Sequence, residues 1–442
     1  MGQRPMTSAP SWPTLSVSSR LRATVAALLL ALFTTQGGPA LGDDPLPQGS
    51  RIDPPRDRAA AVRMASELAG GRQSPLVALG GAAFASPLPY GEAARAAGLS
   101  CNACHSNGHV NQGFNIPGYS GHPGSFDATS ALFNPRADNG VHDPVDIPSL
   151  RGVRFRSRFG RDGRFGSLRE FARHVIVDEF GGPEPAPLIL DALAAWMGEL
   201  EFLSNPRIGP LGRLGEDATA AERRGEALFN QPFAGMGGLA CSSCHIPAAG
   251  FADGRSHDVG TGGRYDTPTL LNAGSSAPYF HDGSAPDFAA VIAGFDDRFG
   301  FGLSAAARED LGAYLSAVGD GEDAWEPPSF RRDMSDLSIW VDLLDGTLRR
   351  REVAVTRFVA DTVRHELQRV ARAWPEGDSS DRADRRRERF DPIRLAALMD
   401  TVATDAEAGD LEAGLAALDA YYTLAETMIA NYPRGGAAVM RR

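Results

Sequence analysis

The sequence predicts an all-α protein that contains a duplicated unit, and three features lead to this prediction. A short cysteine motif occurs twice along the chain, and further motifs that follow each copy recur at a constant offset. Each recurring block ends in a helix-like stretch, and the C-terminal quarter has apolar residues at helical spacing over longer stretches. The 50 Gly and 31 Pro residues among 442 are more typical of long loops between helices than of a regular β-sandwich.

All four cysteines of the chain belong to two C-x-x-C-H motifs. The motifs comprise Cys101, Cys104, His105, Cys241, Cys244 and His245. Two thiols at this spacing can each add to one vinyl group of a single haem, and the adjoining His then supplies the proximal nitrogen to the iron. A thioredoxin-like site would not explain the His after both pairs, and a zinc site would need further ligands. The motifs therefore predict two covalently attached c-type haems.

The two halves repeat beyond these motifs. The matching segments are 146–150 and 266–270 (D-I-P-S-L and D-T-P-T-L), 161–163 and 281–283 (R-D-G and H-D-G), and the helix-like 167–177 and 287–295. The first two pairs are offset by 120 residues without a gap. This pattern indicates duplication of a whole unit and not a short-period solenoid.

These motifs resemble the bacterial di-haem cytochrome c peroxidase family, which includes the MauG-like enzymes. The resemblance covers about residues 80–320, and its most specific part after the haem motifs is Tyr265–Gly283. It implies two mostly helical, cytochrome c-like domains with a calcium ion between them. It also implies that the first-half haem binds peroxide and that the second-half haem stores or relays an electron.

The resemblance also implies roles for particular residues. His105 and His245 become the proximal haem ligands, and His281, which begins the H-D-G motif, could bond a haem propionate. Glu179 matches the family's distal carboxylate if a gap of about two residues is allowed. Such a carboxylate moves a proton between the two oxygens of peroxide. The alternative is that Glu179 is a solvated loop acid.

The implied calcium ligands are Asp146, Ser276 and Pro278, of which the last two contribute backbone carbonyls. A ligand set made only of oxygen atoms suits calcium. Asp146 could instead cap a turn before Pro148.

Two positions depart from the family pattern. Arg161 stands where electron-relay peroxidases have a Trp between the haems. Phe295 stands where the second haem takes a Met ligand, or a Tyr in MauG-like enzymes, and Phe cannot ligate iron. The sixth ligand of the second haem is therefore open, and His257 is a possible candidate.

The remaining histidines have weaker assignments. His109 and His122 follow the first haem motif, and either could cover the first iron in a resting state. His142, His174 and His365 are interpreted as structural residues.

The N-terminus has the pattern of an export signal. Arg20 and Arg22 flank the start of an apolar stretch at 21–33, and the small residues Ala40 and Gly42 follow at cleavage-like spacing. The apolar stretch is short for a membrane span. We therefore expect a periplasmic protein that has no stable membrane span after cleavage.

The domains expected from these patterns are a signal peptide at 1–42, a leader at 43–80, haem domains at 81–215 and 216–324, and a helical extension at 325–442. In the extension, helical spacing within 339–374 and 393–432 predicts a helical hairpin that caps the haem domains or forms a docking surface. The charged stretch 382–389 is interpreted as a solvated break, and a second interruption is expected near Gly409.

The expected function is peroxide-driven oxidation. A formal net charge of −11 argues against a nucleic-acid-binding protein. MauG-like oxidation of aromatic residues on an exported partner protein is favoured over peroxide reduction with a small electron-donor protein. The reason is that Arg161 and Phe295 replace the Trp and the Met ligand that electron-relay peroxidases have at these positions. The non-enzymatic alternative is a di-haem electron carrier.

Overall fold

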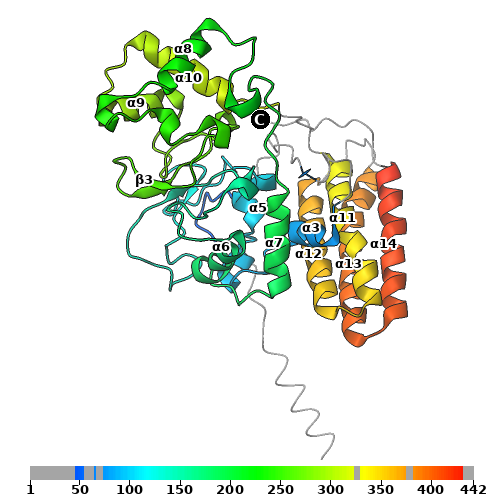
Figure 1. Cartoon of the computed structure of the whole chain (residues 1–442). Coiled ribbons are helices and arrows are strands. Elements are labelled where there is room, and N and C mark those ends of the chain that lie inside the picture. Colours follow the sequence, from blue (N-terminus) through cyan, green and yellow to red (C-terminus); the bar gives the residue numbers. More distant parts are fainter. Residues whose placement is uncertain (1–44, 54–63, 66–72, 323–328, 375–381, 432–442) are drawn as a thin grey trace, which may run out of the picture. The chain divides into compact units, whose positions relative to one another are not determined.

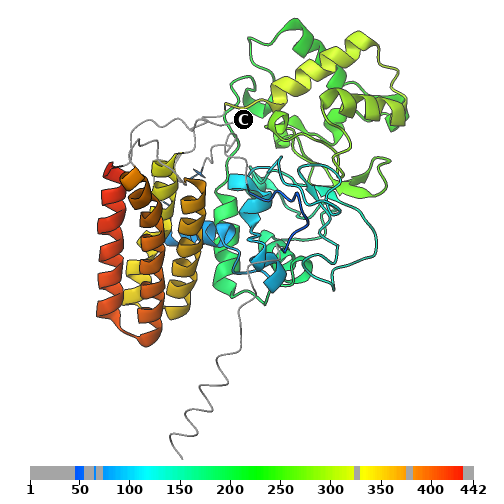
Figure 2. The same ribbon diagram turned by 180° about the vertical axis from the view of Figure 1, so that it is seen from behind.

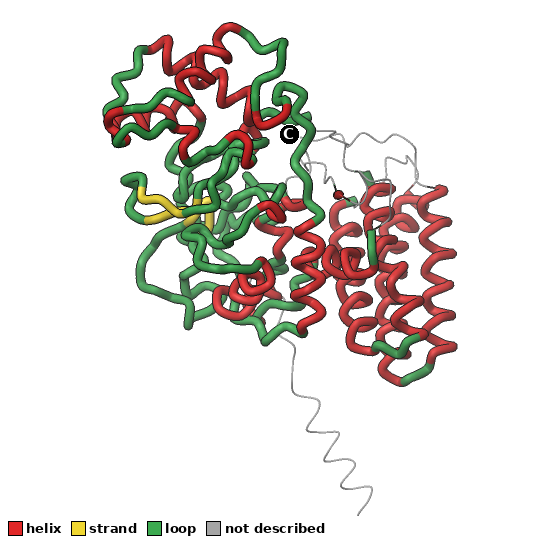
Figure 3. The backbone as a smooth tube through the Cα atoms, viewed as in Figure 1, coloured by secondary structure: helices red, strands yellow, loops and turns green. Residues whose placement is uncertain are grey.

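The computed structural model describes residues 45–53, 64–65, 73–322, 329–374 and 382–431. Residues from 46 onwards belong to one compact unit, and the predicted signal peptide at 1–42 lies outside the described residues. Among the described residues helices dominate, and the strands form two short antiparallel pairs (Figure 3). This confirms the predicted all-α fold class.

Among the residues that the structure describes, the first haem half has five α-helices, of which α3 and α7 pack with their backbones in contact (Figure 1). The helices are α3 (Pro75–Ala85), α4 (Glu92–Ala96), α5 (Cys101–Cys104), α6 (Leu168–His174) and α7 (Pro187–Gly198). A Cβ atom at Gly80 would lie 2.0 Å from the carbonyl oxygen of Ala192, so only glycine permits this crossing. The Ser74 side chain accepts a hydrogen bond from the Val77 N–H and caps α3.

The second haem half has the same kind of close helix contact at a glycine. Its helices are α8 (Ala220–Phe229), α9 (Phe288–Phe299) and α10 (Ala305–Gly319). A Cβ atom at Gly225 of α8 would lie 2.0 Å from the Asp310 carbonyl oxygen of α10. Thr219 and Glu222 form a reciprocal capping box that starts α8. A glycine therefore sets the closest helix contact in each half.

Loops and short turns make up much of both halves. The strands β1 (Ser125–Phe126) and β2 (Val145–Asp146) pair Ser125 with Asp146, and β3 (Ser256–Asp258) and β4 (Arg264–Asp266) pair His257 with Tyr265. The 3-10 turns are η2 (Ser106–Gly108), η3 (Val153–Phe155), η5 (Pro210–Gly212), η6 (Ala234–Met236), η7 (Cys241–Ser243), η8 (Pro247–Ala249) and η9 (Ala273–Ser275). One turn, η4 (Val175–Glu179), is π-helical.

The C-terminal extension is a bundle of four helices that lie side by side in both views (Figures 1 and 2). They are α11 (Phe330–Arg349), α12 (Val353–Ala373), α13 (Arg382–Ala408) and α14 (Leu411–Asn431). Their facing side chains are fully buried, among them Val341, Leu344, Val359, Val363, Leu395, Met399 and Val402. Burial of each such Val or Leu side chain contributes about 1.5–3 kcal/mol to folding.

The predicted helical hairpin is therefore wrong in helix number. The window 339–374 contains parts of two helices, which are separated at Arg351 by a left-handed residue (φ 57°) without Gly or Pro to mark the turn. The charged stretch 382–389 is not a break, because it lies inside α13. The interruption expected near Gly409 is present, and Gly409 has the positive φ of 74° that a helix end favours.

The bundle joins the core of the first half. Leu79 of α3 and Ala192 of α7 belong to the same buried apolar cluster as the bundle residues. The buried Thr362 hydroxyl of α12 donates a hydrogen bond to the Ser86 hydroxyl (2.9 Å). The predicted domain boundaries stay predictions, and α3 crosses the one at residue 80. Of the helices in the described part of the chain, none has the length and apolar character needed to cross a membrane.

Candidate haem sites

A cavity of about 1030 Å³ is lined by residues of both haem motifs. The four cysteine thiols are free, and they and both adjoining histidines contribute to its wall. Phe, Leu, Ile and Val side chains form a large part of the rest of the lining, beside polar side chains such as those of Arg161 and Glu179. Thiol pairs with an adjacent His in a large apolar cavity fit the predicted haem groups.

The two proximal histidines are oriented in the same way. The Nδ1–H of His105 donates to the Pro148 carbonyl (2.9 Å), and that of His245 lies 3.1 Å from the Pro268 carbonyl. The Phe251 carbonyl lies 3.1 Å from the same nitrogen of His245. A proton on Nδ1 leaves the Nε2 lone pair available for iron.

This geometry gives a role to the repeated proline motif. Pro148 and Pro268 occupy equivalent positions in D-I-P-S-L and D-T-P-T-L, and each carbonyl fixes the tautomer of one proximal imidazole. Burial lowers the pKa of His105 to about 4 and also lowers the pKa of His245. Both rings are therefore neutral at physiological pH, as metal ligation requires.

Glu179 ends the π-helical turn η4 and lines the cavity with the first haem motif. The Phe180 N–H donates to the Val175 carbonyl five residues earlier (3.1 Å), which widens this turn. The carboxylate is mostly buried, with 18% of the side chain exposed. Isolated π-helical turns are frequent at functional sites.

His174 is a residue whose role the sequence analysis missed. Its Nδ1 lies 3.0 Å from Asp178 Oδ2, and its Nε2 lies 3.5 Å from Glu179 Oε1. The hydrogen bond with Glu179 is the main cause that raises the pKa of His174. The spacing H-x-x-x-D-E was a usable signal, because i and i+4 share a helix face.

His109 and His122 do not line the cavity, and their ring nitrogens have other partners. The Nδ1 atom of His109 lies 3.0 Å from the Ser149 hydroxyl oxygen, and its Nε2–H group donates a hydrogen bond to the Ser275 carbonyl (3.1 Å). His122 Nε2 lies 3.0 Å from the Asp282 carbonyl oxygen. These imidazoles join the first half to loops of the second, contacts that local sequence could not indicate.

Arg161 and Asp146 face each other where calcium was expected. Arg161 Nη2 lies 3.6 Å from Asp146 Oδ2, and both side chains are largely buried. Burial raises the pKa of Asp146 to about 7, although the Arg161 guanidinium acts in the opposite direction. Ser276 and Pro278 line the same cavity. The arrangement fits calcium poorly, because the carboxylate of the expected ligand set already faces a cation.

We therefore expect chelation to leave both haem spectra of the wild-type protein unchanged, since Arg161 already compensates Asp146. The Arg161→Gln variant should instead acquire a spectral response to added calcium, because its carboxylate would be uncompensated. Metal analysis and visible spectroscopy before and after chelation measure both effects. Stoichiometric calcium in wild-type protein, with spectra that shift on its removal, would contradict this expectation and restore the calcium prediction.

His281 has a buried ring nitrogen and lies in the wall of the cavity. Its ring stacks on Tyr265 with centroids 4.0 Å apart, and its Nδ1 has no hydrogen-bond partner among the described residues. Both residues and Arg161 line the cavity. Unpaired buried donors at a cavity wall fit the carboxylates of haem propionates.

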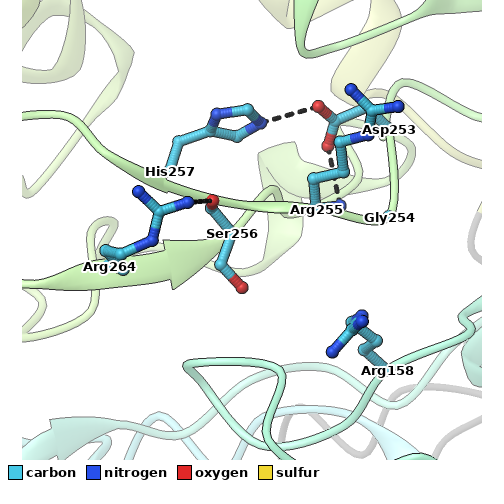
Figure 4. A pocket seen from close by; sticks show the side chains of 7 residues that line it. All are labelled: Arg158, Asp253, Gly254, Arg255, Ser256, His257 and Arg264. Atoms are coloured by element: carbon cyan, nitrogen blue, oxygen red, sulfur yellow. Dashed lines mark hydrogen bonds and ion pairs between the residues drawn. The ribbon is translucent and has the colours of Figure 1, made fainter.

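The second-half side of the cavity has an aromatic wall. Phe295 lines it together with Phe280 and Phe301, and none of these side chains offers a ligand atom. His257 also lines it, but its Nε2 is bound to Asp253 Oδ2 at 2.7 Å (Figure 4). Cys244 Sγ lies within 4.8 Å of this pair. His257 as a sixth ligand stays a prediction, and it would have to use Nδ1 or release Asp253.

Figure 4 also shows an open pocket beside His257. It has a volume of about 670 Å³, and its lining includes the cationic side chains Arg158, Arg255 and Arg264. Arg158 comes from the first half and the other two from the second. The Arg264 guanidinium donates to the Ser256 carbonyl (2.5 Å), which holds it along strand β3.

Comparisons with known proteins agree with the motifs. Residues 220–301 match the family model of di-haem cytochrome c peroxidase. Hydrazine synthase subunit gamma of Kuenenia stuttgartiensis is 26% identical, over 36% of this chain and 58% of that protein. This chain therefore matches less than two thirds of the length of that curated relative. The match confirms the resemblance that the sequence motifs indicated.

Two solved structures are also similar. One is xenon-pressurised hydrazine synthase of Kuenenia stuttgartiensis, with 21% identity and a TM-score of 0.40 over 62% of this chain and 97% of that one. The other is a MauG-like protein associated with microbial copper homeostasis, with 20% identity and a TM-score of 0.40 over 63% and 95% of the respective chains.

Proposed function

We propose that this chain, whose residues 220–301 match the family model of di-haem cytochrome c peroxidase, uses hydrogen peroxide to oxidise aromatic residues of an exported partner protein. The family makes it a haem-dependent oxidoreductase. The observation that carries the proposal is the position of Glu179, a mostly buried carboxylate in the wall that also holds the first haem motif. We also propose covalent attachment of both haems, cleavage of residues 1–42, and a periplasmic location.

The chain's own residues would manage protons and orientation. Haem supplies the redox chemistry when it is bound. His105 and His245 would each present Nε2 to an iron because proline carbonyls hold their Nδ1–H groups. Glu179 would accept a proton from one oxygen of peroxide and return it to the other, which assists O–O cleavage. Reduction of peroxide to two waters consumes two protons and two electrons, and the electrons would come from the partner protein.

The contacts between the halves support a shared function. The Asp266 N–H donates to the Arg161 carbonyl (2.8 Å), and the Asp146 N–H donates to the His281 carbonyl (3.0 Å). The Arg156 and Asp266 side chains form an ion pair. These contacts connect the R-D-G segment of the first half with the D-T-P-T-L segment of the second, and the D-I-P-S-L segment of the first half with the H-D-G segment of the second.

We expect slow steady-state turnover with reduced small cytochromes, well below the ~10 per second that is typical of enzymes. Phe295 offers no thioether, and a thioether ligand raises haem potential, so storage of one electron from a donor is less favourable here. A co-expressed exported partner should gain mass in the presence of peroxide. The Glu179→Gln variant, as the matched control, should leave that partner unmodified.

Turnover of about 10 per second or more with small cytochromes would instead support the alternative, a cytochrome c peroxidase that uses a small electron-donor protein. The non-enzymatic alternative, a di-haem electron carrier, requires both irons to be saturated with ligands. The electron paramagnetic resonance spectrum of the ferric protein separates these classes. A high-spin signal supports an open peroxide site, and two low-spin signals support a carrier.

A further inference from the structure

His174, Asp178 and Glu179 form a line from the cavity wall to the surface. His174 ends α6, with Asp178 Oδ2 at 3.0 Å from its Nδ1 and Glu179 Oε1 at 3.5 Å from its Nε2. The exposed fraction of the side chains rises from 18% for Glu179 to 27% for His174 and 50% for Asp178. The imidazole therefore separates the cavity-lining carboxylate from a solvated one.

The local backbone explains why one ring contacts both acids. Helical spacing of four residues places Asp178 on the face of His174. Glu179, one residue further, would be rotated away from this face in a regular α-helix. The π-helical turn Val175–Glu179 has more residues per turn and brings Glu179 back to the ring.

The two imidazole nitrogens have different surroundings. The Nδ1–H donates to Asp178, which keeps the ring in one orientation. Arg164 Nη2 lies 3.3 Å from Nε2, and Arg164 is itself paired with Asp162 (3.1 Å). A neutral ring can accept from Arg164 at Nε2, and a protonated ring can donate from Nε2 to Glu179.

The surrounding charges act on this nitrogen in opposite directions. The hydrogen bond with Glu179, the charge of Glu179 and the hydrogen bond with Asp178 raise the pKa of His174, whereas burial and the Arg164 guanidinium lower it. Arg173 lies 3.6 Å from Asp178 and is also paired with Glu184. The ring is therefore a titratable group whose pKa is raised from its ordinary value, and it can take up and release a proton as a histidine relay requires.

We infer that His174 relays protons between solvent and Glu179, with Asp178 holding the ring in position. In each cycle Nε2 takes a proton from water and transfers it to the Glu179 carboxylate, which returns the ring to its neutral state. The Nδ1–H group keeps its hydrogen bond to Asp178 throughout. This inference rests on the proposed function, in which every peroxide consumes two protons at a carboxylate with little solvent contact. His174 is a positioning and proton-supply residue, and it does not contact the reacting oxygens.

Replacement of His174 by Gln should slow the steady-state consumption of peroxide by the holoprotein, with a small reducing molecule as electron donor, by about tenfold or more, because the two protons are taken up together with the two electrons; this is less than direct loss of an acid–base group. The wild-type rate should fall as pH rises through the raised pKa of His174, because the ring is then neutral. The rate of the His174→Gln variant should not show this decrease with rising pH. Asp178→Asn should keep the decrease but move it to lower pH, because one of the carboxylates that favour the charged ring is lost.

Two controls separate a relay from a structural role. His365→Gln replaces a half-buried histidine of the C-terminal bundle and should match the wild-type rate and pH profile. Added 2-methylimidazole, whose methyl group hinders binding to iron, should restore part of the rate in His174→Ala, which a purely structural defect would not permit. Both haem spectra of each variant report whether the site is intact. A His174→Gln variant that matches His365→Gln while Glu179→Gln is slow would overturn the relay and leave the proposed function standing.

Cyanide binding to the ferric protein tests the relay without peroxide chemistry. Hydrogen cyanide binds iron as the anion, so its proton must leave through Glu179 and the relay. His174→Gln should slow cyanide association by about tenfold, which is less than direct loss of an acid–base group would cause. If wild-type protein does not react with peroxide, the proposed function fails, and an unchanged cyanide rate in His174→Gln would then refute the relay separately.

Discussion

Glu179→Gln is expected to slow the reaction with hydrogen peroxide by ~100- to 10,000-fold while both haems remain attached. The amide has the shape of the carboxylate but cannot accept and return a proton at neutral pH. Glu179 lines the cavity beside the first haem motif, and most of its side chain is shielded from solvent. Water is therefore a poor substitute for it. Stopped-flow spectroscopy of the ferric protein with peroxide measures the change.

A matched control is available on the same helical segment. Glu170→Gln replaces an exposed acid in the first turn of α6 that does not line the cavity, and it should react at the wild-type rate. Unchanged kinetics in Glu179→Gln would remove this residue from the mechanism. Asp178, which is half exposed and also contacts His174, would then be the next carboxylate to test.

Replacement of both Cys241 and Cys244 by Ala should yield a protein that carries a single covalent haem, because no thiol remains in the second half to form a thioether. His245 would still face the cavity, but the haem would no longer be bonded to the chain. Loss of the group that fills an apolar cavity should also destabilise the cluster around Phe229 and Phe251.

Mass spectrometry of protein from cells competent in cytochrome maturation gives the number of haems and the N-terminal cleavage point together. The reciprocal variant, with Cys101 and Cys104 replaced by Ala, should lose the other haem and keep the one at Cys241. A wild-type mass with fewer than two covalent haems would contradict the central cofactor assignment.

Alignment by motif located Glu179 only approximately. Counted from Asp162 and Gly163, the distal acid matched only with a gap of about two residues. The π-helical turn Val175–Glu179 gives a reason for an irregular register, because wider turns change which side chains share a face. Sequence spacing assumes a regular helix and contains no signal for such a turn.

The helical extension shows a similar limit. Apolar spacing correctly predicted helices in 339–374, since burial of one face leaves a periodic pattern. The same pattern results from one long helix or from two helices in sequence, and the turn at Arg351 has no Gly or Pro to mark it. Helix type was therefore predictable, and helix number was not.

The sequence by itself determined the haem chemistry and the duplication, because both depend on residues close together in the chain. Two thiols and a His within five residues are sufficient to indicate haem attachment. Only the tertiary structure decided what the other polar side chains do, since an imidazole or guanidinium interacts with whatever group packing places beside it. His109 reaches Ser275, Arg161 faces Asp146, and the carbonyl of Pro148 orients His105, each across a separation in sequence that no local pattern records.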